Sequence, residues 1–114
     1  MNSILIVEDN LGMRNVLEKT LKMKGYDVFS VGTAEDAINL FSSYIFDLVI
    51  TDLKLPKADG IEALKKAKKS SPSTIVIIMT AYGTIENAVE AMKLGAYDYI
   101  LKPFTLEEIE IKVE

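Results

Sequence analysis

The chain has 114 residues, 49% of them hydrophobic and 26% charged, with a net charge of −4 and neither histidine nor cysteine. This length suits one domain with a single core, and no apolar run approaches the ~20 residues that span a bilayer. Ser–His–Asp and Cys–His catalysis, disulfides and the usual zinc sites are excluded, the negative charge disfavours nucleic-acid binding by this domain, and the absence of cysteine fits the cytoplasm.

Short apolar and β-branched runs alternate with amphipathic helical patterns along the chain. Strands are expected at residues 3–7, 27–31, 47–51, 74–79 and 97–101. The first, third and fourth runs are almost continuously apolar, which is typical of parallel strands that are covered on both faces. The pattern therefore predicts a parallel sheet between two layers of helices.

The first helix is expected at residues 11–24. Its apolar face carries Val16, Leu17 and Leu21, and Gly25 follows as a residue that readily takes the left-handed conformation at a helix end. Thr33 starts a Thr-x-x-acid signal that is typical of a helix N-terminus. The remaining helices are expected from the turn Asp59-Gly60 to Lys69, at about residues 85–94 before Gly95, and after the second such signal at Thr105.

Five βα units in series predict an α/β fold. The expected architecture is a doubly wound, flavodoxin-like, five-stranded parallel sheet in the order 2-1-3-4-5, with right-handed crossovers and helices on both faces. A single domain spanning residues 1–114 accommodates this order better than the larger six-stranded Rossmann order. In such sheets ligands bind beyond the carboxyl ends of the strands, where strands one and three lie side by side.

Five polar residues fall at these carboxyl ends. Glu8 and Asp9 follow the first strand, Asp52 follows the third, Thr80 follows the fourth and Lys102 follows the fifth. Taken singly, the aspartate and the threonine are more often helix caps, and the lysine is more often solvated. Their joint placement on one rim favours a functional site.

This set of residues suits a magnesium ion and a phosphoryl group. Three converging carboxylates repel one another unless a cation neutralises them, and ligands that are all oxygen favour Mg²⁺. Mg²⁺ and Lys102 together balance the charges of Glu8, Asp9 and Asp52. The neutralised site can admit an anion, with Asp52 as a carboxylate nucleophile and Thr80 as a hydrogen-bond donor to a bound phosphoryl group.

Four segments carry a resemblance to a known family. The stretches ILIVEDN, DLVITDLKLPKADG, IIMTAYG and GAYDYILKPF occur in the order found in two-component response regulator receiver domains, and the likeness extends over essentially the full length. The resemblance implies that Asp52 accepts a phosphoryl group from a phosphohistidine on a sensor histidine kinase. The domain would therefore be a switch in a phosphorelay and not an enzyme in its own right.

The resemblance also implies a role for each residue of the site. Glu8, Asp9 and Asp52 would bind Mg²⁺ together with the backbone carbonyl of Lys54, although many relatives have aspartate where Glu8 stands. Thr80 and Lys102 would bind the phosphoryl oxygens, and Ala81 would leave the approach beside Thr80 open. Lys54 and Tyr82 would shield the acyl phosphate or position the attacking water. Tyr99 would act with Thr80 as the switch residue.

The segment TAYGTIENAVEAMKLGAYDYILKPF is most similar to receivers of the NtrC class of transcriptional activators. This resemblance implies ATPase and DNA-binding output domains on a longer chain, a truncated last helix, and control through the surface of helix 4, strand 5 and helix 5, with a change in homodimerisation. A free-standing single-domain regulator is the first alternative.

Two other functions use a similar site. A Mg²⁺-dependent aspartyl phosphohydrolase typically has a second aspartate two residues after the nucleophile, where this chain has Lys54. A flavodoxin-like FMN binder would need hydroxyls and amides in its first loop, but here that loop reads EDNLGMR and is acidic. Small phosphodonors distinguish these functions, because a switch gives a stoichiometric acyl phosphate and an enzyme gives turnover.

Overall fold

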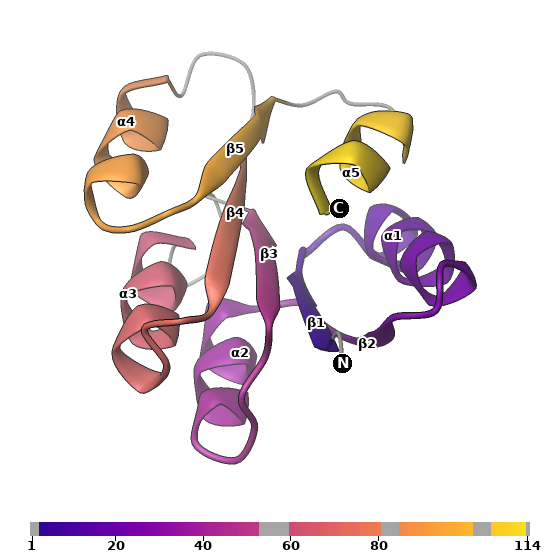
Figure 1. Cartoon of the computed structure of the whole chain (residues 1–114), viewed down its shortest axis with the longest axis horizontal. Helices are drawn as coiled ribbons and strands as arrows, with labels where there is room; N and C mark the ends of the chain where they lie inside the picture. Colours follow the sequence, from indigo (N-terminus) through magenta and orange to yellow (C-terminus); the bar gives the residue numbers. More distant parts are fainter. Residues whose placement is uncertain (1–2, 53–59, 81–84, 102–105, 114) are drawn as a thin grey trace.

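The computed structural model describes residues 3–52, 60–80, 85–101 and 106–113. Strands and helices alternate strictly along these ranges (Figure 1). In chain order they are β1 (Ser3–Val7), α1 (Leu11–Met23), β2 (Asp27–Val31), α2 (Ala34–Phe41), β3 (Leu48–Asp52), α3 (Gly60–Ser70), β4 (Ile75–Thr80), α4 (Ile85–Lys93), β5 (Asp98–Leu101) and α5 (Leu106–Val113).

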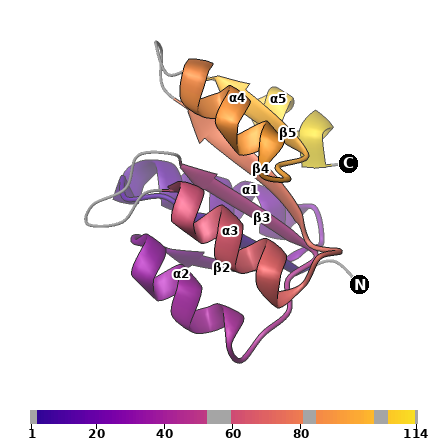
Figure 2. The same cartoon turned by 90° about the vertical axis from the view of Figure 1, so that its left-hand side faces the viewer.

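The strands form one parallel sheet in the order β2-β1-β3-β4-β5, which confirms the predicted fold class. Helices α1 and α5 cover one face, and α2, α3 and α4 cover the other (Figures 1 and 2). The register places Val7 beside Val31 on one side and beside Thr51 on the other. The carboxyl ends of β1 and β3 therefore meet at the same edge of the sheet.

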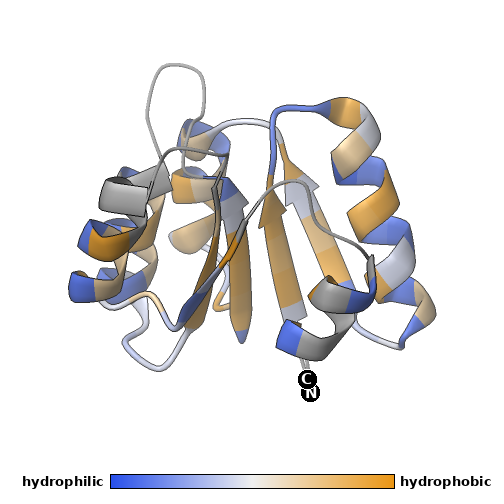
Figure 3. Cartoon of the chain, turned by 90° about the horizontal axis from the view of Figure 1, so that it is seen from above, coloured by the Kyte–Doolittle hydropathy of each residue, from blue (hydrophilic) through white to orange (hydrophobic). Residues whose placement is uncertain are grey.

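The alternation of side chains along β1 explains why this strand is apolar throughout. Ile4 and Ile6 are buried in the core that includes residues of α1 and α5, whereas Leu5 and Val7 are buried in the core that includes residues of α2 and α3. Successive side chains of a strand point to opposite faces, so a central strand between two helical layers needs apolar residues at every position. Figure 3 shows the result, with largely apolar strands between helices that carry both polar and apolar residues.

Helix α1 follows its predicted boundaries within one residue. Gly25 follows the helix with a φ of 97°, the left-handed conformation that the sequence predicted, and Asn10, which was not predicted as a cap, caps the N-terminus. Leu17 and Leu21 are fully buried, but Val16 is 46% exposed, so the expectation that Val16 shares their face is wrong. The reason is geometric. Residues four apart, such as Leu17 and Leu21, lie on the same side of a helix and face the sheet, whereas Val16 is turned about 100° away from Leu17.

No helix in the described ranges is both long enough and apolar enough to cross a membrane. Helix α1, for example, has 13 residues, which corresponds to about 20 Å at the α-helical rise, against the ~30 Å hydrocarbon core of a bilayer.

A hydrogen bond from a buried threonine joins the segments that lead into β3 and β4. The Thr74 hydroxyl donates to the carbonyl oxygen of Phe46 at 2.7 Å, and the Thr74 side chain is buried. We expect Thr74→Val to lower the free energy of unfolding by about 1–3 kcal/mol, because the Phe46 carbonyl loses its donor in a site closed to water. Urea denaturation measures this change. Thr74→Ser is the control that keeps the hydroxyl and loses only the methyl group, so it should lose less stability. A Thr74→Val variant as stable as the parent would show that the hydrogen bond adds no net stability.

Candidate functional site

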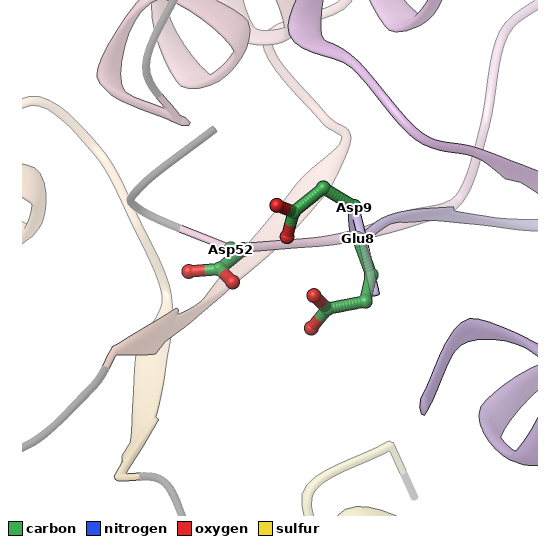
Figure 4. Close-up of side chains that lie close together, drawn as sticks. All are labelled: Glu8, Asp9 and Asp52. Carbon is green, nitrogen blue, oxygen red and sulfur yellow. The ribbon is translucent and has the colours of Figure 1, made fainter. Parts of the chain in front are cut away.

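Three carboxylates converge at the carboxyl ends of β1 and β3. Glu8 and Asp9 follow the last residue of β1, and Asp52 is the last residue of β3. One carboxylate oxygen from each residue can be chosen so that all three lie within 4.8 Å of one another (Figure 4). The predicted convergence of Glu8, Asp9 and Asp52 is therefore present in the structure.

The three acids differ in their exposure to solvent. The side chain of Glu8 is fully buried and that of Asp52 is only 7% exposed, whereas Asp9 is exposed. Burial of a carboxylate is costly unless hydrogen bonds or charges compensate it. The backbone N–H of Asn10 donates to Oε2 of Glu8 at 3.1 Å, and the Asn10 side chain in turn accepts from the N–H of Met13 as the cap of α1.

The donor set and its spacing fit a magnesium ion. All three side chains offer oxygen, the ligand type that Mg²⁺ prefers, and the exposed Asp9 leaves room for the waters that this ion usually keeps. Magnesium binds oxygen at about 2.1 Å, so two ligands on opposite sides of the ion lie roughly 4 Å apart. A spacing of up to 4.8 Å needs only a small side-chain adjustment or one bridging water.

The other predicted site residues are described only in part. Thr80 ends β4 and pairs with Leu101 of β5, which places its backbone at the same edge of the sheet as Asp52. Four of the remaining predicted residues lie outside the described ranges, as does Thr105, the predicted start of the last helix: they are Lys54, Ala81, Tyr82 and Lys102.

Tyr99, the predicted switch residue, lies in β5 beside Ile78 and is 40% exposed. The neighbouring Asp98 accepts hydrogen bonds from the Tyr99 N–H at 2.8 Å and from the Lys112 ammonium of α5 at 2.6 Å. Burial raises the pKa of Asp98, but the bonds from Lys112 and Tyr99 and the charge of Lys112 together outweigh it, so the pKa of Asp98 is lowered. The ion pair thus links α5 to the strand that carries Tyr99.

Two residues near the acids were not predicted from the sequence. The guanidinium of Arg14 donates to the backbone carbonyl oxygen of Glu8 at 3.4 Å, and it lies against the backbone of Gly32. The sequence offered one indication that Arg14 has a particular role, because it is the only arginine among 13 basic residues. Its spacing of six residues from Glu8 did not by itself indicate a contact.

Comparison with known proteins identifies the family. Residues 4–114 match the response regulator receiver domain family. Two solved structures have a similar fold: a response regulator receiver domain protein from Clostridium thermocellum (TM-score 0.93, 32% identity) and the receiver domain of NtrX from Brucella abortus (TM-score 0.89, 31% identity). The chain aligns over 99% and 96% of its own length with them, covering 91% and 92% of theirs.

The curated relatives are longer regulators. The chain is 39% identical over its whole length to the regulatory protein AtoC of Escherichia coli K12, and 37% identical over 97% of its length to the transcriptional regulatory protein ZraR of the same organism. It spans about a quarter of the length of each relative, 25% in both cases. These matches confirm the resemblance to NtrC-like regulators and indicate a signalling domain, not an enzyme. The chain belongs to the response regulator receiver domain family.

Proposed function

We propose that this domain is a phosphorylation-controlled switch in which Asp52 is the phosphoacceptor. The observation that supports this function best is the convergence of Asp52 with Glu8 and Asp9 at the edge where β1 and β3 end. A carboxylate oxygen of Asp52 would attack the phosphorus of a phosphohistidine on a sensor kinase. The new bond joins this oxygen to phosphorus, the P–N bond breaks, and its electron pair returns to the imidazole nitrogen.

Glu8, Asp9 and Asp52 would bind Mg²⁺, with the Lys54 carbonyl as a further ligand. When bound, the ion offsets the negative charge that the carboxylates and the phosphoryl oxygens bring together. By similarity to the family, Thr80 and Lys102 bind the phosphoryl oxygens, and Ala81 and Tyr82 border the access route. Burial supports the assignment of Asp52 as the phosphoacceptor. Because its side chain is only 7% exposed, the surrounding protein keeps most bulk water from the reacting oxygen.

The output is proposed to be transcriptional. AtoC and ZraR are regulators of which this chain matches one quarter, and NtrX from Brucella abortus has been solved with ADP as a chain of which 26% is covered. We infer a cytoplasmic, NtrC-like protein with ATPase and DNA-binding domains beyond the receiver. Nucleic-acid contact is assigned to those domains, since the receiver itself carries a net charge of −4.

A free-standing regulator is the second candidate. The specific observation in its favour is a CheY-like receiver protein from Methanospirillum hungatei, at 34% identity, of which this chain covers 94%. An immunoblot of the native cells separates the two, since a free-standing protein runs near 12.7 kDa and a regulator of AtoC's proportions runs about four times higher.

Phosphorylation is proposed to change the surface formed by α4, β5 and α5. The added charge and acceptor oxygens at Asp52 would attract the Thr80 hydroxyl, and Tyr99 would rotate from its half-exposed position into the space beside β4. The altered surface would then change homodimerisation or release the output domain. The phosphoryl group shifts this equilibrium only by its differential affinity for the two states, so both are populated beforehand.

Beryllofluoride with Mg²⁺, which mimics the acyl phosphate, tests this route by NMR. We expect shifts at the acidic site and also at Tyr99 and residues 84–105. Thr80→Ala should keep the shifts at the acidic site and largely lose the shift at Tyr99. Shifts that stop at the acidic site in the parent protein would contradict the proposed route.

A further inference from the structure

The loop that carries Glu8 and Asp9 is held by hydrogen bonds on both sides. The N–H of Glu8 donates to the carbonyl oxygen of Val31 at 3.0 Å, which ties the loop to the end of β2. The N–H of Arg14 donates to the carbonyl oxygen of Asn10 at 2.9 Å as part of the first turn of α1. Two peptide groups lie between these anchors, and the first of them links Glu8 to Asp9.

The Arg14 guanidinium holds that peptide. Its Nη1 donates to the carbonyl oxygen of Glu8 at 3.4 Å, and this carbonyl belongs to the Glu8–Asp9 peptide. The orientation of one peptide plane sets ψ of the residue before it and φ of the residue after it. A contact at this oxygen therefore constrains the directions of both acidic side chains.

Gly32 provides the space in which the guanidinium lies. A Cβ at Gly32 would overlap Nη1 of Arg14 and would lie 3.9 Å from the Glu8 carbonyl oxygen. Among the described glycines, those with positive φ are Gly25 and Gly95, so Gly32 is not required by a left-handed backbone. Gly32 has no side chain, and the end of the Arg14 side chain occupies the space that a Cβ would take. An alanine at position 32 would therefore displace the guanidinium.

We propose that Arg14, seated against Gly32, is a positioning residue that orients Glu8 and Asp9 for metal binding beside Asp52. This inference rests on the proposed function, because it assumes that the acidic site binds Mg²⁺. Arg14 suits the task because its planar guanidinium presents several donors in a fixed geometry, whereas a lysine presents a flexible point charge.

The direction in which Arg14→Ala changes the Mg²⁺ affinity distinguishes a positioning role from a purely electrostatic one. Arg14 is always cationic, and from helix α1 it contacts the loop that carries two ligands of a divalent cation. If its charge alone mattered, Arg14→Ala would make the site more negative and tighten Mg²⁺ binding. If Arg14 orients the Glu8–Asp9 peptide, the same substitution weakens binding.

The experiment measures Mg²⁺ dissociation constants by calorimetric titration, with urea denaturation of each variant to record folding. We expect Arg14→Ala and Gly32→Ala each to weaken Mg²⁺ binding about tenfold, in the range found when groups that orient metal ligands are removed. The double variant should bind as weakly as Arg14→Ala alone, because Gly32 acts only through Arg14. Arg14→Lys should bind about as weakly as Arg14→Ala although it retains the charge.

Two controls match these changes. Lys19→Ala removes a positive charge from an exposed position of the same helix, and Gly12→Ala adds a Cβ whose nearest neighbour is 3.4 Å away, an ordinary contact. Both should bind Mg²⁺ within about twofold of the parent, a difference below ~0.4 kcal/mol. If Gly32→Ala fails to fold, the comparison of Arg14→Ala with Arg14→Lys decides the question.

Each of the following results would overturn the inference: tighter binding in Arg14→Ala, parental affinity in Gly32→Ala, or losses that multiply in the double variant. A parent protein that binds no Mg²⁺ would instead overturn the proposed function, and the inference with it. A parent that binds Mg²⁺ while the Arg14 variants match it refutes the positioning role alone.

Discussion

Asp52→Asn is expected to abolish Mg²⁺-dependent phosphorylation by a small phosphodonor while the fold is retained. The amide has nearly the shape of the carboxylate but is a poor nucleophile and cannot form the acyl phosphate. The substitution also removes one of three like charges whose oxygens lie within 4.8 Å, so stability without metal should not fall. Intact-protein mass spectrometry after incubation with acetyl phosphate and Mg²⁺ measures the added group.

Asp27→Asn is the matched control for this experiment. Asp27 is exposed and begins β2, at the opposite end of the sheet from the acidic site, so its variant should be phosphorylated like the parent. The linkage provides a second check, because an acyl phosphate is labile to alkali. Undiminished labelling of Asp52→Asn at an alkali-stable linkage would show that another residue is the acceptor.

Magnesium is expected to raise the melting temperature of the parent protein. A ligand that binds only the folded state at ten times its Kd adds about 1.4 kcal/mol of stability, which for a domain of this size corresponds to roughly 5 °C. Asp9→Asn should lose most of this increase, because one of three ligands has lost its charge. In the absence of metal the same variant should melt above the parent, since the repulsion among Glu8, Asp9 and Asp52 is reduced.

Thermal denaturation followed by circular dichroism, with Mg²⁺ and with a chelator, measures both effects. Asp27→Asn again serves as the control and should respond to Mg²⁺ like the parent. A parent whose melting temperature is the same in both conditions would contradict magnesium binding by the three carboxylates. A metal-free Asp9→Asn variant that melts well below the parent would show that Asp9 stabilises the fold through hydrogen bonds that outweigh the repulsion.

Features that depend on a few neighbouring residues were predictable from the sequence. The apolar run of β1 indicated a strand buried on both faces, Thr33 indicated the start of α2, and Gly25 indicated the end of α1. Each depends on local geometry: the period of a strand, a side chain that accepts a backbone N–H, and a left-handed φ. The strand order then followed from the alternation of elements, and with it the placement of Glu8, Asp9 and Asp52 at one edge.

The differences among the residues of this edge arise from packing between distant segments of the chain. Glu8 and Asp9 are adjacent in the sequence, yet the first is fully buried and the second is exposed, because burial depends on what α1 and the sheet place around each side chain. The contact of Arg14 with Gly32 joins α1 to the residue that follows β2, across 18 positions of the chain, and no local rule connects such residues. The kinds of side chain in the site could be read from the residues alone, whereas their burial and orientation depend on contacts that the folded chain makes between distant segments.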